Sequence, residues 1–408
     1  RVLNQTTKRN ATLSAPRIAI DARMTPTSPG GVLQVVIGMA HGLSQLTDGN
    51  EEYTFLVDSS YDGWLDAYLG DNCQLLQVGF TSSVTLRSAA ARMGFVKPAV
   101  PKSDGTVERQ GYDGIHFLLP MGFRTRVPSF YQIHDLQHLH FPENFSRRTR
   151  LLRDAMYAAM CGQATRVFTM TAWGKQDAVD RLRLEPEKID VVPWGSVLSA
   201  YREPSSEKLD QVCNKYRLNG PFALFPAKAY AHKNHGRLLK AIARLRDQEQ
   251  LRVPLVLCGA PGAATASIDR TIARLCLKDQ VRHLGFVGSD DITALFHRCH
   301  CVVFPSLFEG WGLPITEALS LKRPIACANA ACLPEVAGDA AAYFDPLNVK
   351  SMAYQIRQVW TNAELRKQLA QNARGVVRNL TWKNTAQQFR THYRDIFGGN
   401  SARHTVAA

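Results

Sequence analysis

The sequence lacks long apolar runs, which bears on whether the chain can cross a membrane. No stretch approaches the ~18 consecutive apolar residues that cross a bilayer. Residues 1–16 are polar and lack the apolar centre of a secretory signal. We therefore expect a cytoplasmic protein, with residues 1–16 as a disordered lead-in.

Motifs for cofactors and metals are also missing. The sequence contains no Gly-x-Gly-x-x-Gly fingerprint, so a nicotinamide cofactor is not indicated. It contains no Asp-x-Asp triplet, so carboxylates that hold a metal ion against a diphosphate are not indicated either. The nine cysteines form no Cys-x-x-Cys pair and predict buried free thiols in a reducing compartment. The cluster His297, Cys299, His300 and Cys301 matches no usual zinc spacing, and we expect no metal site there.

Acidic residues are few relative to basic ones. The chain has 49 Lys and Arg against 35 Asp and Glu, a formal net charge of +14. Such a surplus indicates phosphorylated ligands, anionic lipid or nucleic acid, but no nucleic-acid-binding module is recognisable and we expect no nucleic acid. One basic, partly apolar segment follows the strand expected at residues 74–78. It is either a solvated loop or a segment that contacts the inner face of an anionic membrane. Its basic residues are Arg87, Arg92, Lys97 and Lys102.

The chain of 408 residues is too long for one ordinary core, and its 45% hydrophobic content is that of a globular protein. Strand and helix patterns alternate on both sides of the polar stretch 196–220, which predicts an α/β protein with two parallel sheets. The expected parts are a lead-in (1–16), an N-terminal domain (17–200), a linker (201–219), a C-terminal domain (220–380), a helix returning to the N-terminal domain (381–397) and a disordered tail (398–408).

Apolar runs and helical periodicity place the individual elements. Strands are expected at residues 17–21, 53–57, 74–78, 114–119, 129–135, 166–171, 188–193, 222–225, 254–258, 281–284, 301–304 and 324–328. Helices are expected at residues 32–46, 147–161, 172–183, 234–246, 264–277, 291–298, 314–321, 350–360, 363–379 and 383–397.

The stretch Cys301–Ser320 combines a buried strand, a loop with two glycines and a proline where a helix begins. Glu309 lies in the loop and Glu317 in the expected first turn of the helix. Free backbone N–H groups at such a corner suit phosphate, and carboxylates suit hydroxyls, so a nucleotide sugar fits this chemistry. Alternatively, the glycines only shape a turn, and Glu317 has no role beyond its favourable interaction with the helix dipole.

Other strand ends carry polar residues of the same character. Gly30 and Gly31 follow the first expected strand and permit a close approach of backbone to ligand, or only form a tight turn. His134 ends another strand, where open α/β sheets bind their ligands. Lys228 and Lys233 follow the first strand of the second sheet and precede a helix. Two cations ahead of a helix N-terminus suit a diphosphate. Alternatively, both are ordinary solvated lysines.

Together these features resemble the retaining glycosyltransferases of family 4. The motifs that carry the resemblance are Glu309-Gly310-Trp311-Gly312-Leu313-Pro314 through Glu317 (Glu, seven residues, Glu), Leu333-Pro334-Glu335-Val336, Gly338-Asp339-Ala340, Phe344-Asp345-Pro346, Lys233-Asn234, Gly30-Gly31, His134-Asp135 and Trp382. They cover residues 17 to 397. Three positions depart from the pattern: Lys228 stands in place of an arginine, Thr171 in place of a serine, and Trp194 in place of an asparagine. A lysine offers a point charge instead of a two-pronged fork, which puts the grip on phosphate in doubt.

The resemblance implies the GT-B architecture, in which two Rossmann-like domains face a central cleft. Residues 17–200 are then the acceptor side and residues 220–380 the nucleotide-sugar side. It also implies a retaining, metal-independent hexosyltransferase of surface-glycan or polysaccharide synthesis. The donor is of the GDP-mannose or UDP-glucose type, no cofactor is needed, and the acceptor is a saccharide or a lipid-linked saccharide.

Residue roles follow from the same resemblance. Glu309 holds hydroxyls of the transferred sugar, Glu317 the ribose, and His134 the sugar or its phosphate. The expected catalytic residues are Glu309, His134 and Lys233; the expected donor-binding residues are Gly30, Gly31, Lys228, Lys233, Gly310, Trp311, Gly312, Leu313 and Glu317. Two other classes stay open: a catalytically silent nucleotide-sugar-binding module, and a phosphorylase or epimerase on the same fold.

Overall fold

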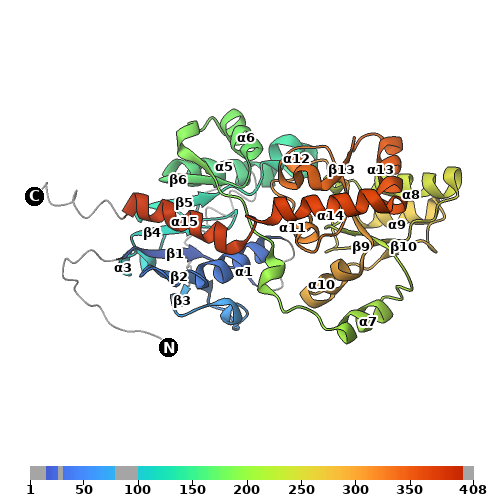
Figure 1. Cartoon of the computed structure of the whole chain (residues 1–408). Helices are drawn as coiled ribbons and strands as arrows, with labels where there is room; N and C mark the ends of the chain where they lie inside the picture. Colours follow the sequence, from blue (N-terminus) through green and yellow to red (C-terminus); the bar gives the residue numbers. More distant parts are fainter. Residues whose placement is uncertain (1–14, 26–30, 79–99, 398–408) are drawn as a thin grey trace, which may run out of the picture.

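The computed structural model of the chain describes residues 15–25, 31–78 and 100–397. These residues form a seven-stranded and a six-stranded sheet, each with helices on its faces (Figure 1). All the strand pairs of both sheets are parallel. The predicted parallel α/β fold is therefore confirmed.

The bounds of the elements agree with most of the expected ones. The first sheet contains β1 (Arg17–Asp21), β2 (Glu52–Asp58), β3 (Cys73–Val78), β4 (Gly114–Phe117), β5 (Ser129–Gln132), β6 (Arg166–Thr169) and β7 (Ile189–Val191). The second contains β8 (Ala223–Pro226), β9 (Leu255–Cys258), β10 (Val281–His283), β11 (Cys301–Phe304), β12 (Ile325–Ala328) and β13 (Ala341–Phe344). The helices are α1 (Gly31–Ser44), α3 (Thr106–Arg109), α4 (Gln137–His140), α5 (Arg147–Gln163), α6 (Ala172–Leu182), α7 (Ser206–Lys215), α8 (His235–Glu249), α9 (Thr265–Arg274), α10 (Ser289–Arg298), α11 (Leu313–Ser320), α12 (Leu333–Ala337), α13 (Val349–Thr361), α14 (Ala363–Val377) and α15 (Trp382–Phe397).

The central strands are short and buried on both faces, which explains why they appear in the sequence as continuous apolar runs. All four residues of β4, β5, β9, β11 and β12 are buried. In the first sheet Ile20 of β1 lies beside Phe55 of β2 and His116 of β4. In the second, Val302 of β11 lies beside Leu224 of β8 and Ile325 of β12.

Each sheet has one point at which the order of its strands reverses. The first sheet runs β3-β2-β1-β4-β5-β6-β7, so the order reverses between β1 and β4. The second runs β10-β9-β8-β11-β12-β13 and reverses between β8 and β11. Crossovers leave on opposite sides at such a point and open a crevice at the carboxyl ends of the strands, where ligands bind. The loops after β8 and β11 carry Lys228, Lys233 and Glu309.

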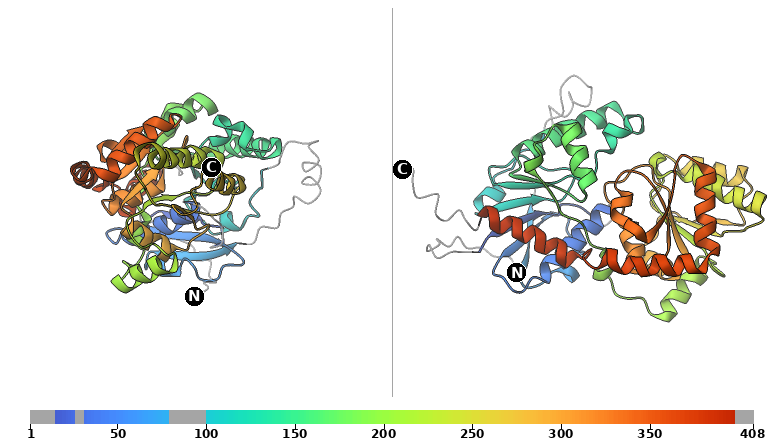
Figure 2. Two further views of the ribbon diagram at one scale, coloured as in Figure 1. Left: turned by 90° about the vertical axis from the view of Figure 1, so that its right-hand side faces the viewer. Right: turned by 45° about the horizontal axis from the view of Figure 1, so that its top comes forward.

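The last helix, α15, lies on the N-terminal lobe, whereas α14 lies on the C-terminal one (Figure 2, right). Glycine permits the close contact of α15 with α1, because a Cβ atom at Gly38 would lie 2.0 Å from the Trp382 ring. Arg390 of α15 donates to Asp48 at 2.6 Å and is itself 1% exposed. The end of the chain thus spans both lobes and ties them together.

Five of the elements were not predicted from the sequence: α3, α4, α7, α12 and β13. Helix α7 lies within the expected linker 201–219; Ser205 caps it, and Lys215 binds Asp291 of α10 at 2.5 Å. Its apolar residues Leu209 and Val212, three positions apart, are the signal that was missed. The short α12 and strand β13 both lie close to β12 in the chain, and with five and four residues each is too short to show a helical or strand period.

Some predictions lie outside the described residues. These concern Gly30, the basic residues Arg87, Arg92 and Lys97, residues 1–14 of the lead-in and the tail 398–408. Within the described ranges, no helix combines the length and the apolar character that a membrane-spanning segment requires.

Candidate functional site

The centre of the site is an ion pair between the loops that follow β8 and β11. Lys233 Nζ lies 2.5 Å from Glu309 Oε1, and the side chains are 17% and 13% exposed. Each side chain thus remains open to a ligand on one side. The sequence placed both residues at strand ends, and the reversal of strand order between β8 and β11 brings them together.

A buried asparagine holds these two loops in register. Asn234 adopts a left-handed conformation (φ 63°), and its side-chain amide donates to the carbonyls of Pro305 at 3.1 Å and Pro346 at 2.8 Å. The backbone N–H of Leu307 donates to the carbonyl of His232 at 2.8 Å. The backbones that carry Lys233 and Glu309 are therefore fixed relative to each other, so the pair is preorganised.

Glu317 lies deeper and in a less polar environment. The prediction that it stands in the first turn of its helix is wrong, because α11 begins at Leu313 and its first turn contains no acidic residue. Its side chain is buried and has no hydrogen bond or ion pair to the described residues. Burial without a partner raises the pKa of the Glu317 carboxyl to about 8. At neutral pH the protonated carboxyl can both donate and accept a hydrogen bond.

The raised pKa of Glu317 has a testable effect on stability. In the folded chain this pKa is about 8, against an ordinary 4.5. Between these values the folded state binds more protons than the unfolded state, so the free energy of unfolding falls as pH rises through this window. We expect Glu317→Gln to raise the melting temperature by about 5 °C or more at pH 8 and by much less at pH 5.

Thermal denaturation of the two proteins from pH 5 to pH 8.5 measures this difference. Glu364→Gln is the control, because that side chain is 82% exposed on α14 and its substitution should shift the melting temperature equally at all pH values. A gap between wild type and Glu317→Gln that does not widen with pH would contradict the raised pKa.

Two helix N-termini meet near this centre. Helix α1 begins at Gly31 in the first domain and α11 at Leu313 in the second. A Cβ atom at Gly31 would lie 2.9 Å from the Leu313 side chain, so the absence of one brings the two helix starts together. The first N–H groups of both helices have no partner within their helix and carry partial positive charge. Lys228 lies in the same loop as Lys233, and its Nζ lies 4.8 Å from the centre of the Tyr230 ring.

His134 follows β5 of the first domain, and its backbone carbonyl lies against Gly310 of the second domain. Its Nε2 lies 2.5 Å from the carbonyl oxygen of Leu118. A carbonyl only accepts hydrogen bonds, so Nε2 carries the proton and Nδ1 of the neutral ring is an acceptor. Burial lowers the pKa of His134, which favours this neutral form. The Trp194 ring, 5.1 Å away, holds the imidazole in place.

The glycines of the Glu309–Leu313 loop allow the two domains to touch. A Cβ atom at Gly310 would lie 1.7 Å from the carbonyl oxygen of His134, so only glycine fits there. Gly312 has φ 93° and precedes α11, in the left-handed region that favours glycine. Trp311 is buried between them, with 5% of its surface exposed.

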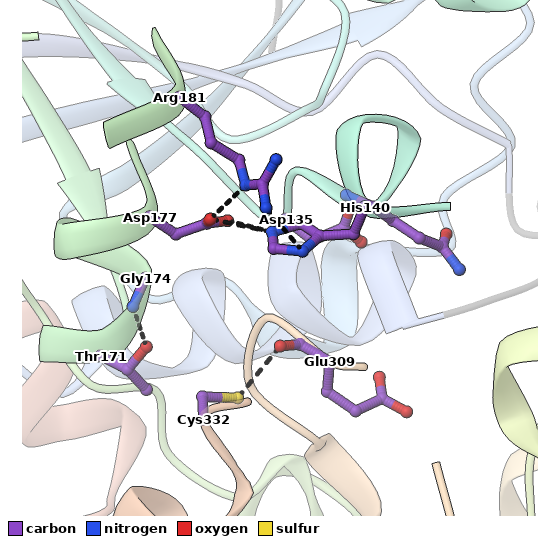
Figure 3. A network of polar contacts seen from close by, with 9 residues as sticks. Asp135, His140, Thr171, Gly174, Asp177, Arg181, Glu309 and Cys332 are labelled. Carbon is purple, nitrogen blue, oxygen red and sulfur yellow. Dashed lines mark hydrogen bonds and ion pairs between the residues drawn. The ribbon is translucent and has the colours of Figure 1, made fainter. Parts of the chain in front are cut away.

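A second interdomain contact surrounds Phe308, next to Glu309. Its ring lies 4.4 Å from the His140 ring and 5.6 Å from the Trp173 ring, measured between centroids. His140 Nε2 donates to the Asp177 carboxylate at 2.8 Å, and Arg181 Nε donates to the same oxygen at 2.9 Å (Figure 3). This network fixes His140 against Phe308 and so supports the loop that carries the catalytic candidate.

A carboxylate from the second domain closes the N-terminus of α6 in the first. The two oxygens of Glu335 accept from the backbone N–H groups of Ala172 at 2.7 Å and Trp173 at 2.9 Å. These donors are otherwise unsatisfied in a helix, and the charge of the carboxylate complements the helix dipole. Glu335 belongs to the Leu-Pro-Glu-Val segment, which was noted in the sequence without a role.

Sequence reasoning missed two residues that support the site. Trp194 replaces a polar residue of the family pattern, and its ring packs against His134 and, at 6.1 Å, against Trp382. Cys332 donates from Sγ to the carbonyl of Glu309 at 3.2 Å (Figure 3), and burial raises the pKa of its thiol. Neither contact has a signal in the sequence, because the partners are distant along the chain.

The described residues contain no group of three or more His, Cys, Asp and Glu side chains that would hold a metal ion. The cysteines among them are free, and Cys299 and Cys301 are buried. The cation that the structure places beside Glu309 is Lys233.

Comparisons with known proteins agree with this geometry. The family model described as glycosyl transferases group 1 matches residues 210–376. The O-antigen chain mannosyltransferase B of Escherichia coli is 27% identical over 279 residues, which cover 68% of this chain and 72% of that protein. The serotype-specific mannosyltransferase WbdA of Escherichia coli is 32% identical over 187 residues, which cover 45% of this chain and only 23% of WbdA.

A solved structure shows the same fold over almost the entire chain. HepE of Anabaena, in complex with UDP and glucose, superposes with a TM-score of 0.70 at 18% identity and covers 93% of this chain and all of its own. At this identity the likeness shows the fold alone, which is GT-B. Residues 210–376 thus match the group 1 glycosyl transferases, and the two-domain fold of the chain is that of the GT-B class.

Proposed function

We propose that the protein is a retaining, metal-independent hexosyltransferase that uses a nucleotide diphosphate sugar. The observation that carries this proposal is the Lys233–Glu309 pair at the carboxyl ends of β8 and β11. A cation for the diphosphate and a carboxylate for sugar hydroxyls lie side by side there. Mannose is the preferred sugar because several relatives are named mannosyltransferases, two of them of O-antigen chains. The acceptor is a saccharide or lipid-linked saccharide in surface-glycan synthesis.

The leaving diphosphate needs positive charge as its bond to the sugar breaks. Lys228 and Lys233 supply two cations, and the helix starts at Gly31 and Leu313 supply backbone N–H donors. Groups that are fixed before the reaction stabilise such a developing charge without further reorganisation. Binding of the diphosphate to Lys233 also frees Glu309 from its ion pair for the sugar.

The transfer itself breaks one bond and forms another at C1 of the sugar. The bond from C1 to the phosphate oxygen breaks and leaves an oxocarbenium-like centre. The acceptor hydroxyl oxygen bonds to C1 from the same face, and its proton passes to the oxygen of the leaving phosphate. Glu309 holds the sugar hydroxyls, and His134 Nδ1 accepts a hydrogen bond from another hydroxyl. Glu317 binds the ribose.

Donor binding and transfer test the proposal together. A ligand at about 100 times its Kd adds about 2.7 kcal/mol to the free energy of unfolding, which a thermal-shift assay resolves. We expect GDP-mannose to raise the melting temperature more than UDP-glucose, and free mannose not to change it. With methyl α-mannoside as acceptor, NMR of the product should show the α configuration of the donor retained. Donor binding without any turnover would instead indicate a silent binding module.

The same assay tests whether a metal ion takes part. We expect EDTA to leave the transfer rate unchanged, because lysines and helix N-termini take the place of a cation at the diphosphate. The control is a metal-dependent glycosyltransferase treated in parallel. A rate that collapses with EDTA and returns with magnesium would overturn this part of the proposal.

A further inference from the structure

A large cavity lies between the two domains, beside the loop that carries Lys233. Its volume is about 1000 Å³, enough for more than one sugar unit. The N-terminal domain contributes residues of α4, α5 and the turn between them, and the C-terminal domain contributes α8, α9 and the loops before them. The residues that the argument uses are Arg153, Arg237, Lys240, Arg274, His235 and Gly236.

The lining of this cavity is strongly basic. Four Lys and Arg residues line it against the single carboxylate of Glu143. Lys240 and Arg274 are exposed and form no ion pair with any described residue. Arg237 reaches only the side-chain oxygen of Asn234, at 3.1 Å, and has further N–H donors to offer. Arg153 is paired with Asp135 at 3.7 Å, so the unpaired cations are Arg237, Lys240 and Arg274. Unpaired cations around one concave space favour an anionic ligand.

The start of helix α8 opens into the same cavity. Gly236 is the second residue of this 15-residue helix, and a Cβ atom there would meet no neighbouring heavy atom within 4 Å. The first backbone N–H groups of the helix lack partners within it and suit a phosphate group. His235, which is 4% exposed, also lines the cavity, and its Nδ1 has no hydrogen-bond partner in the described part of the chain.

The cavity is separate from the donor site but adjoins it. Neither Lys228, Lys233 nor any residue of Glu309–Glu317 lines it. Its wall includes the hydrogen bond that joins Gln137 of the first domain to His232 of the second. Since His232 precedes Lys233 in the chain, a ligand in the cavity lies next to the loop that binds Glu309.

We propose that this cavity binds a phosphate group carried by the acceptor. The proposal rests on the proposed function, because it assigns to the acceptor a site apart from the donor. An arginine fork, a lysine and a helix N-terminus together suit phosphate oxygens, and the volume leaves room for attached sugar. The phosphate belongs either to a soluble phosphosaccharide or to a lipid headgroup, which share this chemistry.

Calorimetry with mannose 6-phosphate, and with mannose as the neutral comparison, tests the site. We expect the full-length protein to bind the phosphate and not mannose. The double substitution Lys240→Ala and Arg274→Ala should weaken this binding at least tenfold, because each of the two side chains would lose a charged hydrogen bond to the phosphate. Gly236→Asp should weaken it as much, although aspartate at a helix start stabilises the helix. Arg270→Ala on the same helix α9 is the matched control and should bind as wild type, because Arg270 does not line the cavity.

Binding of GDP by the same variants separates this site from the donor site. We expect GDP to bind all of them equally and not to compete with mannose 6-phosphate. Failure of GDP to bind any of them counts against the proposed function, whereas failure of mannose 6-phosphate alone counts against this cavity. Vesicles of phosphatidylcholine with phosphatidic acid test the lipid source, and displacement of mannose 6-phosphate by them assigns the phosphate to a lipid. If neither mannose 6-phosphate nor the vesicles bind, or if the variants bind both unchanged, the proposal is wrong.

Discussion

Replacing Glu309 by glutamine should lower kcat by about 10²-fold or more if the carboxylate stabilises the transition state. Glutamine keeps the size of the side chain but removes the negative charge that lies 2.5 Å from Lys233 Nζ. In the proposed mechanism the charge of Glu309 lies beside an electron-deficient sugar, so its effect belongs to the transition state more than to the bound donor. We therefore expect kcat to fall while the Kd of GDP changes little.

Steady-state kinetics with GDP-mannose, together with calorimetry of GDP, measure this difference. Glu364→Gln on α14 removes the same charge from a side chain that is 82% exposed, and it should leave kcat unchanged. Unchanged turnover in Glu309→Gln would remove this residue from the mechanism. An equal rise in KM and in the Kd of GDP, at constant kcat, would limit its role to binding.

Replacing Gly310 by alanine should lower kcat by between about 10-fold and 10²-fold. The added methyl group overpacks the contact between the domains, and the shifts that accommodate it cost about 1–3 kcal/mol. A Cβ atom there would lie 1.7 Å from the backbone carbonyl of His134 in the other domain. A backbone atom moves less easily than a side chain, so the two domains must separate. In the proposed mechanism, Glu309 and His134 then no longer reach one sugar together.

Turnover, the Kd of GDP and the melting temperature of Gly310→Ala should be measured side by side. We expect binding of GDP to persist, because the loops after β8 and β11 belong to one domain. Gly375→Ala on α14 is the matched control, since a Cβ atom there would meet no neighbouring heavy atom within 4 Å. Full activity of Gly310→Ala would show that the contact with His134 is not needed for transfer.

The positions of most strands and helices were predictable because they depend on local patterns. The apolar run at 301–304 is buried on both faces, and Pro314 lies in the first turn of α11. The exceptions are elements whose patterns are short or mixed. Helix α7 shows only two apolar residues three positions apart, and the four residues of β13 are too few to show a strand period.

The site was predictable only as a set of residue types at strand ends. Lys233, Glu309 and His134 each followed an apolar run, which places them at the carboxyl edges of parallel sheets. The residues that depart from the family pattern could be identified in the sequence, but the contacts they make could not. Trp194, for example, acts by packing between His134 and Trp382, which only a folded chain brings near each other.

The sequence alone determined that this chain forms α/β domains and that the corner Cys301–Ser320 combines a strand, a glycine loop and a helix start. Those features depend on residues near one another along the chain, through burial, periodicity and backbone conformation. Only the tertiary structure decided what the corner touches: Glu309 meets Lys233 because β8 and β11 are neighbours, and Gly310 meets His134 because the domains are in contact. It also decided the raised pKa of Glu317 and the basic cavity beside α8. Both arise from residues far apart in sequence, since burial and charge depend on everything that packs around a group.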